Sequence, residues 1–319
     1  MTWTTQRLRI GISSCLLGEP VRFNGGHARD RSLLELLGPY VEWVPVCPEV
    51  GAGMGIPREA VRLVGDVHAP RLVGATTGQD WTEAMRIWTE AQLEHLALLD
   101  LDGYIFKSRS PTCGLFRVKV YDHNGIPHKE GRGLFAEALV RRFPLLPVEE
   151  EGRLQDSLLR ENFIDRLFAY HRLRQFLQEN PSPQTLVRFH TAHKLTLMSH
   201  SPKHLKSLGQ LVAKAGNEPW EELLESYAQQ FMAAMNVMAT RKKHANVLFH
   251  LAGYLRDYLL PEDRAELHTL IEDYRQGLVP LITPIVLLRH HFRRFPVHPW
   301  IRTQVYLEPY PKELRLRNT

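Results

Sequence analysis

The pattern of hydrophobic and polar residues divides the chain into two parts. In the first part, short apolar runs alternate with stretches in which apolar residues recur every three or four positions. A short apolar run bounded by turn residues predicts a buried strand, and the longer repeat predicts a helix with one buried face. The predicted strands are 8–13, 41–46, 60–64, 71–74, 103–106 and 118–121, and the predicted helices are 81–99 and 133–143.

The second part is almost purely helical from about residue 155 onward. Apolar residues at helical spacing recur along it, and loops that contain proline or glycine separate them. Pro147 and an acidic run interrupt both patterns between 146 and 155, where we place the domain boundary. We predict an α/β domain over 1–153, with a largely parallel, Rossmann-like sheet, followed by an all-α domain over 154–319.

Composition narrows the class of protein. The chain has 319 residues, of which 44% are hydrophobic and 24% charged, as in globular proteins. Apolar stretches are broken well before the ~20 residues that a membrane helix needs, and the first residues lack the pattern of a signal peptide. We therefore expect a cytoplasmic protein without a membrane segment. The formal net charge of +5, with 16 histidines besides, favours a polyanionic partner.

The three cysteines each follow a predicted strand. Cys15 and Cys47 come soon after the first two strands, and Cys113 lies beyond the strand 103–106. In an open α/β sheet the carboxyl ends of the strands line one crevice, so the three thiolates could share one site. Three thiolates can hold a 4Fe–4S cluster and leave one iron without a protein ligand. From spacing alone, unrelated buried thiols and a zinc site of three cysteines and one histidine stay open as alternatives.

Basic and aromatic residues provide candidate nucleic-acid contacts in both parts. Lysine and arginine neutralise phosphates, and aromatic rings stack on exposed bases. The helical part has basic groups at 241–244 and 289–294; a solvated helix face with ordinary core aromatics is the alternative. We interpret His193, His244, His290 and His291 as structural residues or phosphate contacts rather than a metal site. The candidate contacts are Arg22, Asn24, Arg58, Lys107 and Arg109 in the first part and Phe189, His190, Trp300, Tyr306 and Tyr310 in the second.

Several short motifs together resemble one known family, the thiouracil desulfidases, over most of residues 8–150. The second part resembles the helical domain often fused to that family. This arrangement is similar to the desulfidases that remove sulfur from 4-thiouridine in tRNA, whereas single-domain relatives act on free thiouracil or thio-nucleotides. The motifs are Ser14-Cys15-Leu16-Leu17-Gly18, Arg22-Phe23-Asn24-Gly25-Gly26, Cys47-Pro48-Glu49, Lys107-Ser108, Ser110-Pro111-Thr112-Cys113-Gly114, Thr240-Arg241-Lys242-Lys243-His244 and Tyr306-Leu307-Glu308-Pro309-Tyr310-Pro311.

The resemblance implies roles for individual residues. Glu49 and Ser110 match the two catalytic positions of the family. The match of Ser110 rests on aligning Ser-Pro-Thr-Cys in this chain with a Ser-Pro-Ser-Cys pattern. Ser108 is the alternative hydroxyl and a candidate substrate contact. The positions that match the three ligands of a 4Fe–4S cluster with one open iron are Cys15, Cys47 and Cys113.

The reaction that follows from these roles is a hydrolysis without net electron transfer. The open iron would draw electron density from the thiocarbonyl group of the base, while Glu49 acts as general base and Ser110 relays a proton or orients the water. We predict 4Fe–4S-dependent removal of sulfur from 4-thiouridine in tRNA, which yields uridine and sulfide. The alternatives are a desulfidase of free thiouracil or 4-thio-UMP and a non-catalytic, metal-stabilised RNA-binding protein.

Overall fold

The protein forms two compact units in a computed structural model that describes residues 7–318. An α/β unit extends through Asp156, and a helical unit begins at Ser157. The predicted boundary lay at 153/154, inside a short 3₁₀ turn at Arg153–Gln155. The order of an α/β part followed by an all-α part confirms the predicted fold class. Within the described residues, no helix is both long and apolar enough to cross a membrane.

The main sheet of the α/β unit has four parallel strands in the order β2-β1-β5-β8. Its first three strands have the predicted bounds, because each is a short, mostly apolar segment between turn residues. The fourth strand lies inside the segment 146–155, in which we placed the domain boundary, so the α/β unit continues through that segment. This strand is only three residues long, and two of these are buried glutamates, which gave no hydrophobic signal. The strands are β1 (Leu8–Ser13), β2 (Val41–Val46), β5 (Gly103–Phe106) and β8 (Val148–Glu150).

A second sheet has the order β4-β3-β6-β7 and is built from two antiparallel hairpins whose inner strands run parallel. The hairpin that ends at β7 turns at Asn124-Gly125, where Gly125 has a φ of +77°, the left-handed conformation that glycine adopts readily. Four of the five residues of β7 are exposed, which is why the sequence did not predict it. The strands are β3 (Val61–Asp66), β4 (Ala69–Gly74), β6 (Val118–Tyr121) and β7 (Pro127–Gly131).

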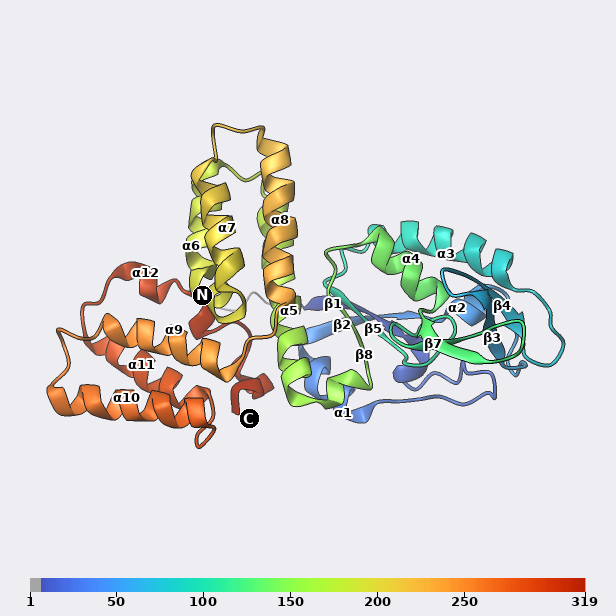
Figure 1. Cartoon of the computed structure of the whole chain (residues 1–319), viewed down its shortest axis with the longest axis horizontal. Helices are drawn as coiled ribbons and strands as arrows, with labels where there is room; N and C mark the ends of the chain where they lie inside the picture. Colours follow the sequence, from blue (N-terminus) through green and yellow to red (C-terminus); the bar gives the residue numbers. More distant parts are fainter. Residues whose placement is uncertain (1–6, 319) are drawn as a thin grey trace. The chain divides into compact units, whose positions relative to one another are not determined.

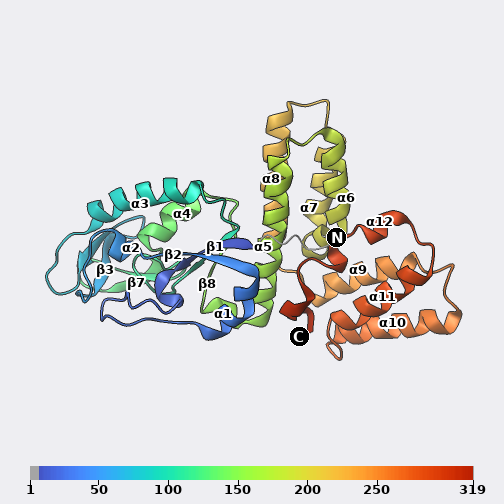
Figure 2. The same ribbon diagram turned by 180° about the vertical axis from the view of Figure 1, so that it is seen from behind.

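Helices cover both faces of the main sheet. Helices α3 (Thr82–Ala97) and α4 (Leu134–Arg142) lie on one side, and α1 (Arg31–Leu37) lies on the other (Figures 1 and 2). Helix α3 turns Met85, Thr89, Leu93 and Leu96 inward, at the spacing that places them on one helical face. The short α1 was not predicted, because only two of its seven residues are buried. The helices cover the faces of the main sheet but not the carboxyl ends of its strands, where loops lie.

The helical unit consists of two groups of helices. In Figure 1 the helices α6, α7 and α8 lie side by side, and α9, α10 and α11 run across their direction. Side chains cap several of the helices; the hydroxyls of Ser182, Ser201 and Thr240 accept backbone hydrogen bonds at the starts of α6, α7 and α9. The helices are α5 (Ser157–Gln178), α6 (Pro183–His200), α7 (Pro202–Ala213), α8 (Trp220–Asn236), α9 (Arg241–Gly253), α10 (Pro261–Gln276), α11 (Ile282–Arg294) and α12 (Pro299–Arg302).

Candidate active site

Loops that follow β1, β2 and β5 enclose a cavity of about 410 Å³, and all three cysteines line it. Cys15 lies in a 3₁₀ turn directly after β1. Cys47 precedes the four-residue helix α2 (Pro48–Gly51), and Cys113 lies in the loop between β5 and β6. Parallel strands end at one edge of a sheet, so side chains far apart in the sequence meet at this place.

Burial changes the acidity of these three thiols, which are all free cysteines. Burial raises the pKa of Cys15 to about 11, and the charge of Lys107 acts in the opposite direction. Burial also raises the pKa of Cys47 and of Cys113. Such thiols stay protonated at neutral pH unless a bound cation displaces their protons. The cavity therefore contains soft ligands that would ionise when a metal group binds.

The hydroxyl of Tyr104 lies near the same three thiols. Tyr104 is fully buried on β5, and its ring occupies the space that a side chain at Gly11 of β1 would need. Burial, and next the charges of Cys113, Cys47 and Cys15, raise the pKa of Tyr104 well above its usual value. Its hydroxyl makes no hydrogen bond of standard geometry within the described part of the chain, although the Ser13 side chain is close enough to lower the pKa of Tyr104 slightly against the effect of burial. Sulfur atoms of a cluster would accept a hydrogen bond from this hydroxyl, so the donor set and the hydroxyl fit an iron–sulfur group.

The arrangement does not fit a single metal ion. Among residues 7–318, no three His, Cys, Asp or Glu side chains converge closely enough to hold one ion. A zinc site of three cysteines and one histidine needs four ligands around one point, which these residues do not form. A 4Fe–4S cluster is wider, and each thiolate binds a separate iron, so its ligands need not converge on one point.

Glu49 is held in place by contacts to both of its carboxylate oxygens. It lies in the first turn of α2, two residues after Cys47. Nε of Arg58 donates to Oε2 of Glu49 at 3.1 Å, and a second guanidinium nitrogen pairs with the same oxygen. Thr112 donates through Oγ1 to Oε1 at 3.0 Å. The ion pair is largely buried, with 8% of the Arg58 side chain and 15% of the Glu49 side chain exposed. Glu49 is thus an oriented carboxylate in the wall of the cavity.

The hydroxyls of Ser110 and Thr112 form a chain that ends at Glu49. Ser110 Oγ accepts hydrogen bonds from the backbone N–H groups of Thr112 at 3.2 Å and Cys113 at 3.1 Å. Because these bonds use its two acceptor sites, Ser110 donates its own proton to Thr112 Oγ1, which is 3.0 Å away. Thr112 then donates to Glu49. Sequence reasoning did not single out Thr112, although it lies within a motif that carried the resemblance.

Lys107 and Ser108 are held by Glu151, which follows β8. Lys107 Nζ pairs with the buried carboxylate of Glu151. The Ser108 backbone nitrogen donates to Glu151 at 2.7 Å, and Ser108 Oγ donates to it at 2.8 Å. Glu150 in turn accepts from the backbone nitrogen of Leu115 at 2.7 Å. The acidic run that we interpreted as a boundary therefore fixes both ends of one loop of the cavity, the loop between β5 and β6. Because Ser108 is bonded to Glu151, Ser110 is the hydroxyl that is linked to Glu49.

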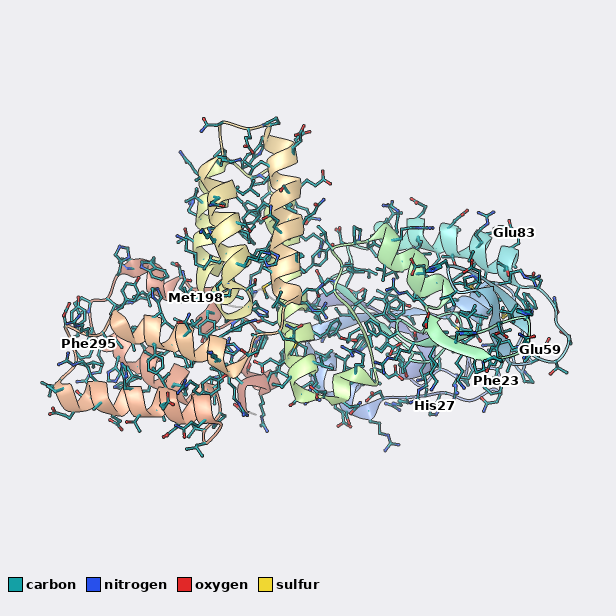
Figure 3. All side chains as sticks on the ribbon, viewed as in Figure 1. Phe23, His27, Glu59, Glu83, Met198 and Phe295 are labelled. Carbon is teal, nitrogen blue, oxygen red and sulfur yellow. The ribbon has the colours of Figure 1, made fainter. Side chains whose placement is uncertain are left out.

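Arg22 and Phe23 form one side of the cavity. Both line it, and the Arg22 guanidinium lies 5.9 Å from the centre of the Phe23 ring. Phe23 is 41% exposed, and Figure 3 labels it in the α/β unit. An exposed aromatic ring at the wall of a cavity can stack on a planar base. Sequence reasoning missed Phe23; its only signal was its position in a glycine-containing loop beside Arg22.

The remaining predicted contacts have other partners. Arg58 lines the cavity, but it also donates to the carbonyl of Val21 at 2.9 Å, in addition to its pair with Glu49. Its contacts indicate that it positions Glu49, and a direct contact to substrate stays a prediction. Asn24 does not line the cavity, and its Oδ1 accepts from the backbone nitrogen of Gly26 at 3.1 Å. Asn24 shapes the turn that carries Arg22 and Phe23.

Most of the predicted RNA contacts in the helical unit pack inside it. The prediction that they stack on bases was wrong for the three buried residues, because these side chains are not accessible. Phe189 stacks on Phe176 with ring centres 4.6 Å apart. Trp300 differs from the others, since it is half-buried and lines a second cavity. The buried residues are His190, Tyr306 and Tyr310.

The two predicted basic groups are partly engaged within the unit. Lys243 donates to the backbone carbonyls of His200 at 2.6 Å and Met238 at 2.8 Å. His244 is buried. The group at 289–294 has an ion pair between Arg289 and Glu308. The exposed cations of the two groups are Arg241, Lys242, Arg293 and Arg294.

Comparison with known proteins identifies the family. A family model described as 2-thiouracil desulfurase matches residues 10–151, and one described as a protein of unknown function (DUF1722) matches residues 194–311. The uncharacterized protein YbgA of Escherichia coli (strain K12) is 30% identical over 157 residues, which are 48% of this chain and 91% of YbgA. The chain belongs to the 2-thiouracil desulfurase family. This finding confirms the family inferred from the motifs, and membership makes the chain a desulfidase.

Two further comparisons concern smaller shares of this desulfurase. The uncharacterized protein YbbK of Bacillus subtilis (strain 168) is 31% identical over 110 residues, which are 33% of this chain and 72% of YbbK. The solved structure of a protein described as the 4Fe–4S-dependent thiouracil desulfidase TudS is 28% identical in sequence. That match covers 47% of this chain and 94% of the TudS chain, with a TM-score of 0.39.

Proposed function

We propose that this desulfurase removes sulfur from 4-thiouridine in tRNA, with a 4Fe–4S cluster held by Cys15, Cys47 and Cys113. One observation carries the proposal: three free thiols, two of them buried and that of Cys47 half-buried, line the same cavity as a fixed carboxylate and two linked hydroxyls. Metal binding explains the thiols, and acid–base chemistry explains the carboxylate. A purely structural cluster would not need the carboxylate and the two hydroxyls beside the thiols.

The bound cluster would supply an iron that polarises the thiocarbonyl group. All three cysteines are needed as its ligands, since the chain has no fourth cysteine. Lys107 lowers the pKa of Cys15 and so favours its thiolate, against the larger effect of burial. Tyr104 would donate a hydrogen bond to sulfur at the inner wall, where its hydroxyl otherwise makes no hydrogen bond of standard geometry.

Glu49, Thr112 and Ser110 would handle the protons. Glu49 accepts a proton from the water that attacks the ring carbon, and Arg58 keeps its carboxylate oriented for that step. Thr112 connects Glu49 to Ser110, so a proton can pass between Ser110 and Glu49 without movement of the backbone. Glu49 would then return its proton to the sulfur, and the second proton of the water would follow as the C–S bond breaks, so that hydrogen sulfide leaves and the water oxygen stays on the ring as a carbonyl.

Phe23 and Arg22 would bind the substrate. The exposed ring of Phe23 offers a stacking surface for the pyrimidine, and Arg22 offers a cation for the phosphate of the same nucleotide. The cavity is lined on many sides and does not admit a base that is still stacked in a helix, so the target nucleotide has to be extruded or already unpaired.

The experiment is anaerobic reconstitution of the full chain followed by nucleoside analysis of thiolated tRNA. We expect bound iron and sulfide and a loss of 4-thiouridine with gain of uridine. Cys113→Ser should lose the cluster and the activity together, while Ser207→Ala, an exchange on α7, should change neither. A zinc-loaded, colourless protein without activity would contradict the proposal. Turnover of 4-thio-UMP with no loss of 4-thiouridine from tRNA would favour the free nucleotide as substrate.

A further inference from the structure

The helical unit contains a second cavity, of about 480 Å³, which is large enough for a small ligand. Thr191, Lys194, Leu195 and Met198 line it from one face of α6, because their spacing repeats every three or four residues. Figure 3 labels Met198, between α6 and the second group of helices. The other lining residues are Leu205 on α7, His250 and Tyr254 at the end of α9, and His298 and Trp300 at α12.

Aromatic rings form another part of the cavity wall. Tyr254 and Trp300 meet edge to face with ring centres 5.4 Å apart, and His250 meets Tyr254 in the same way at 5.4 Å. Tyr254 and Trp300 are only half-buried, so their rings remain accessible from the cavity. Such a wall suits a planar ring, since every nucleobase has a face that stacks on aromatic side chains.

A buried amide fixes the shape of this wall. Gln304 is 4% exposed and donates through Nε2 to the carbonyl of Thr191 at 2.7 Å and to that of Trp300 at 3.4 Å. Its Oε1 accepts from the backbone nitrogen of Leu195 at 3.3 Å. Gln304 thereby ties α6 to the segment that carries Trp300. The cavity is therefore already formed before any ligand binds.

The charges around the cavity favour an anion. Lys194, His250 and His298 line it, and none of the lining residues within the described chain is Asp or Glu. His298 Nδ1 accepts from the Trp300 backbone nitrogen, so its other nitrogen carries the proton and can donate. The helices show the same bias: α6, α7, α9 and α12 contain no carboxylate, and they have two, two, three and one Lys or Arg respectively.

Acidic residues gather on other helices of the unit. Helix α8 has three glutamates and α10 has five carboxylates. The elements that line the cavity thus form the basic side of the unit, with Lys203 and Lys206 exposed on either side of Leu205. A single anionic group needs one cation, whereas a row of exposed cations matches the successive phosphates of a polynucleotide.

We propose that this cavity binds one nucleotide of an RNA chain, with its base against Tyr254 and Trp300 and its phosphate at Lys194. The pocket chemistry stands on the contacts above, and the choice of RNA as the source of the nucleotide rests on the proposed function. This nucleotide is distinct from the thiolated one, because the cavity holds no thiol or carboxylate. The helical unit would thereby bind the RNA through a base that is unpaired or extruded from its stack.

The test measures binding of full-length protein to fluorescently labelled, unmodified tRNA by anisotropy at fixed salt. Trp300→Ala should weaken binding about 10-fold, the effect expected from the loss of one stacked base. Lys194→Glu should weaken it roughly 5-fold through the phosphate contact. The matched controls are Tyr258→Ala, an exposed tyrosine stacked on Phe295, and Arg275→Glu on the acidic helix α10. Both controls should bind tRNA as the unchanged protein does.

Additional measurements separate the possible outcomes. Turnover of 4-thio-UMP by the reconstituted variants should be unchanged, and Lys194→Glu alters an exposed residue, so it tests the proposal even if Trp300→Ala unfolds. Unchanged tRNA binding in Lys194→Glu and in any folded Trp300→Ala would overturn the proposal. Binding of UMP that Trp300→Ala abolishes, with tRNA binding intact, would overturn RNA as the occupant. Weaker tRNA binding by both variants, with no loss of 4-thiouridine in the unchanged protein, would support the pocket and refute the proposed activity.

Discussion

The two cavities of this protein have similar volumes, about 410 and 480 Å³, and very different walls. In the α/β unit, thiols, a carboxylate and hydroxyls line the cavity, and several hold one another by hydrogen bonds. In the helical unit, aromatic and aliphatic side chains line the cavity, and basic groups are the only charged or ionisable side chains among the described lining residues apart from the Tyr254 phenol. The first wall combines groups that can move protons with thiols that can bind a metal group, whereas the second offers stacking rings and cations that suit the recognition of an anionic ligand.

Backbone geometry explains this difference. Loops after parallel strands bring residues from distant parts of the chain to one edge, so several reactive groups can meet there. A helix face instead offers residues three or four positions apart, which on α6 are a cation and mostly apolar side chains. Titratable groups that do converge in the helical unit, such as His193 and His244, are buried in its interior.

The strongest test of the contrast replaces the carboxylate of the reactive cavity. Glu49→Gln keeps the shape of the side chain and its contact to Thr112 but removes the base, so we expect turnover to fall 10²- to 10⁴-fold, roughly the contribution of general base catalysis. Bound iron should be unchanged. Glu42→Gln, an exposed carboxylate on β2, is the control. Full activity of Glu49→Gln would mean that the cavity works without this carboxylate.

Lowering the pH should destabilise the helical unit more than the α/β unit. Burial lowers the pKa of His190 to about 4 and that of His193 and His244 to about 3, while the described histidines of the α/β unit are exposed. Below pH 6.5 the unfolded chain gains protons that these folded histidines do not, so stability present above pH 6.5 is lost as the pH falls. Each of these three histidines should lower the free energy of unfolding by about 2 kcal/mol at pH 5.

Hydrogen exchange at pH 7.5 and 5, corrected for intrinsic rates, measures this effect in each unit separately. We expect protection to fall in the helical unit more than in the α/β unit. His193→Leu should flatten the pH dependence of the helical unit, and His290→Gln, an exposed residue, should not. Equal losses of protection in both units would contradict the assignment of neutral buried histidines.

The hydroxyl chain predicts a smaller effect. Thr112→Val leaves Ser110 and Glu49 without their common partner, which should lower kcat on the order of 10-fold with little change in KM. Thr112→Ser keeps the hydroxyl and should restore most of the rate. Steady-state kinetics on 4-thio-UMP provide the measurement. Equal rates for the valine and serine variants would show that no proton passes through this residue.

The smallest effect concerns Tyr104. Tyr104→Phe removes a buried hydroxyl that makes no hydrogen bond of standard geometry without the cluster and has the Ser13 side chain nearby, so the apo-protein should lose little or no stability. In the reconstituted protein the loss of a hydrogen bond to sulfur should make the cluster potential more negative. Thermal melts of the apo-protein and redox titration of the holo-protein are the two measurements. A destabilised apo-protein with an unchanged potential would place the role of Tyr104 in packing alone.

The sequence predicted those parts of the molecule whose signal is local. Strands β1, β2, β5 and β6 matched their predicted bounds because each is a short, mostly apolar segment next to turn residues. The three cysteines were predicted to meet because each follows such a strand. The site contacts that the sequence did not reveal are pairings across the fold: Glu151 with Lys107, and Thr112 with Glu49. Nothing in the spacing of these residues indicates that they touch.

The helical unit shows the opposite limitation. Its basic and aromatic residues were visible in the sequence, but their exposure was not. His190 and Tyr306 face the interior, whereas Trp300 faces a cavity, and no difference in the local pattern separates them. Helical periodicity places residues on a face, and only the packing of neighbouring helices decides whether that face is covered.

The fourth strand of the main sheet, β8, decides where a separately expressed α/β fragment of this protein can end. The acidic segment around β8 invites a cut near residue 147. Such a cut would discard Glu150 and Glu151, and the loop that carries both Lys107 and Cys113 would lose its anchors. A fragment intended to bind metal and react on its own must extend through Asp156. The position of the edge strand β8, and not the acidic composition of the segment around it, therefore sets the minimum length of a fragment that keeps the candidate active site.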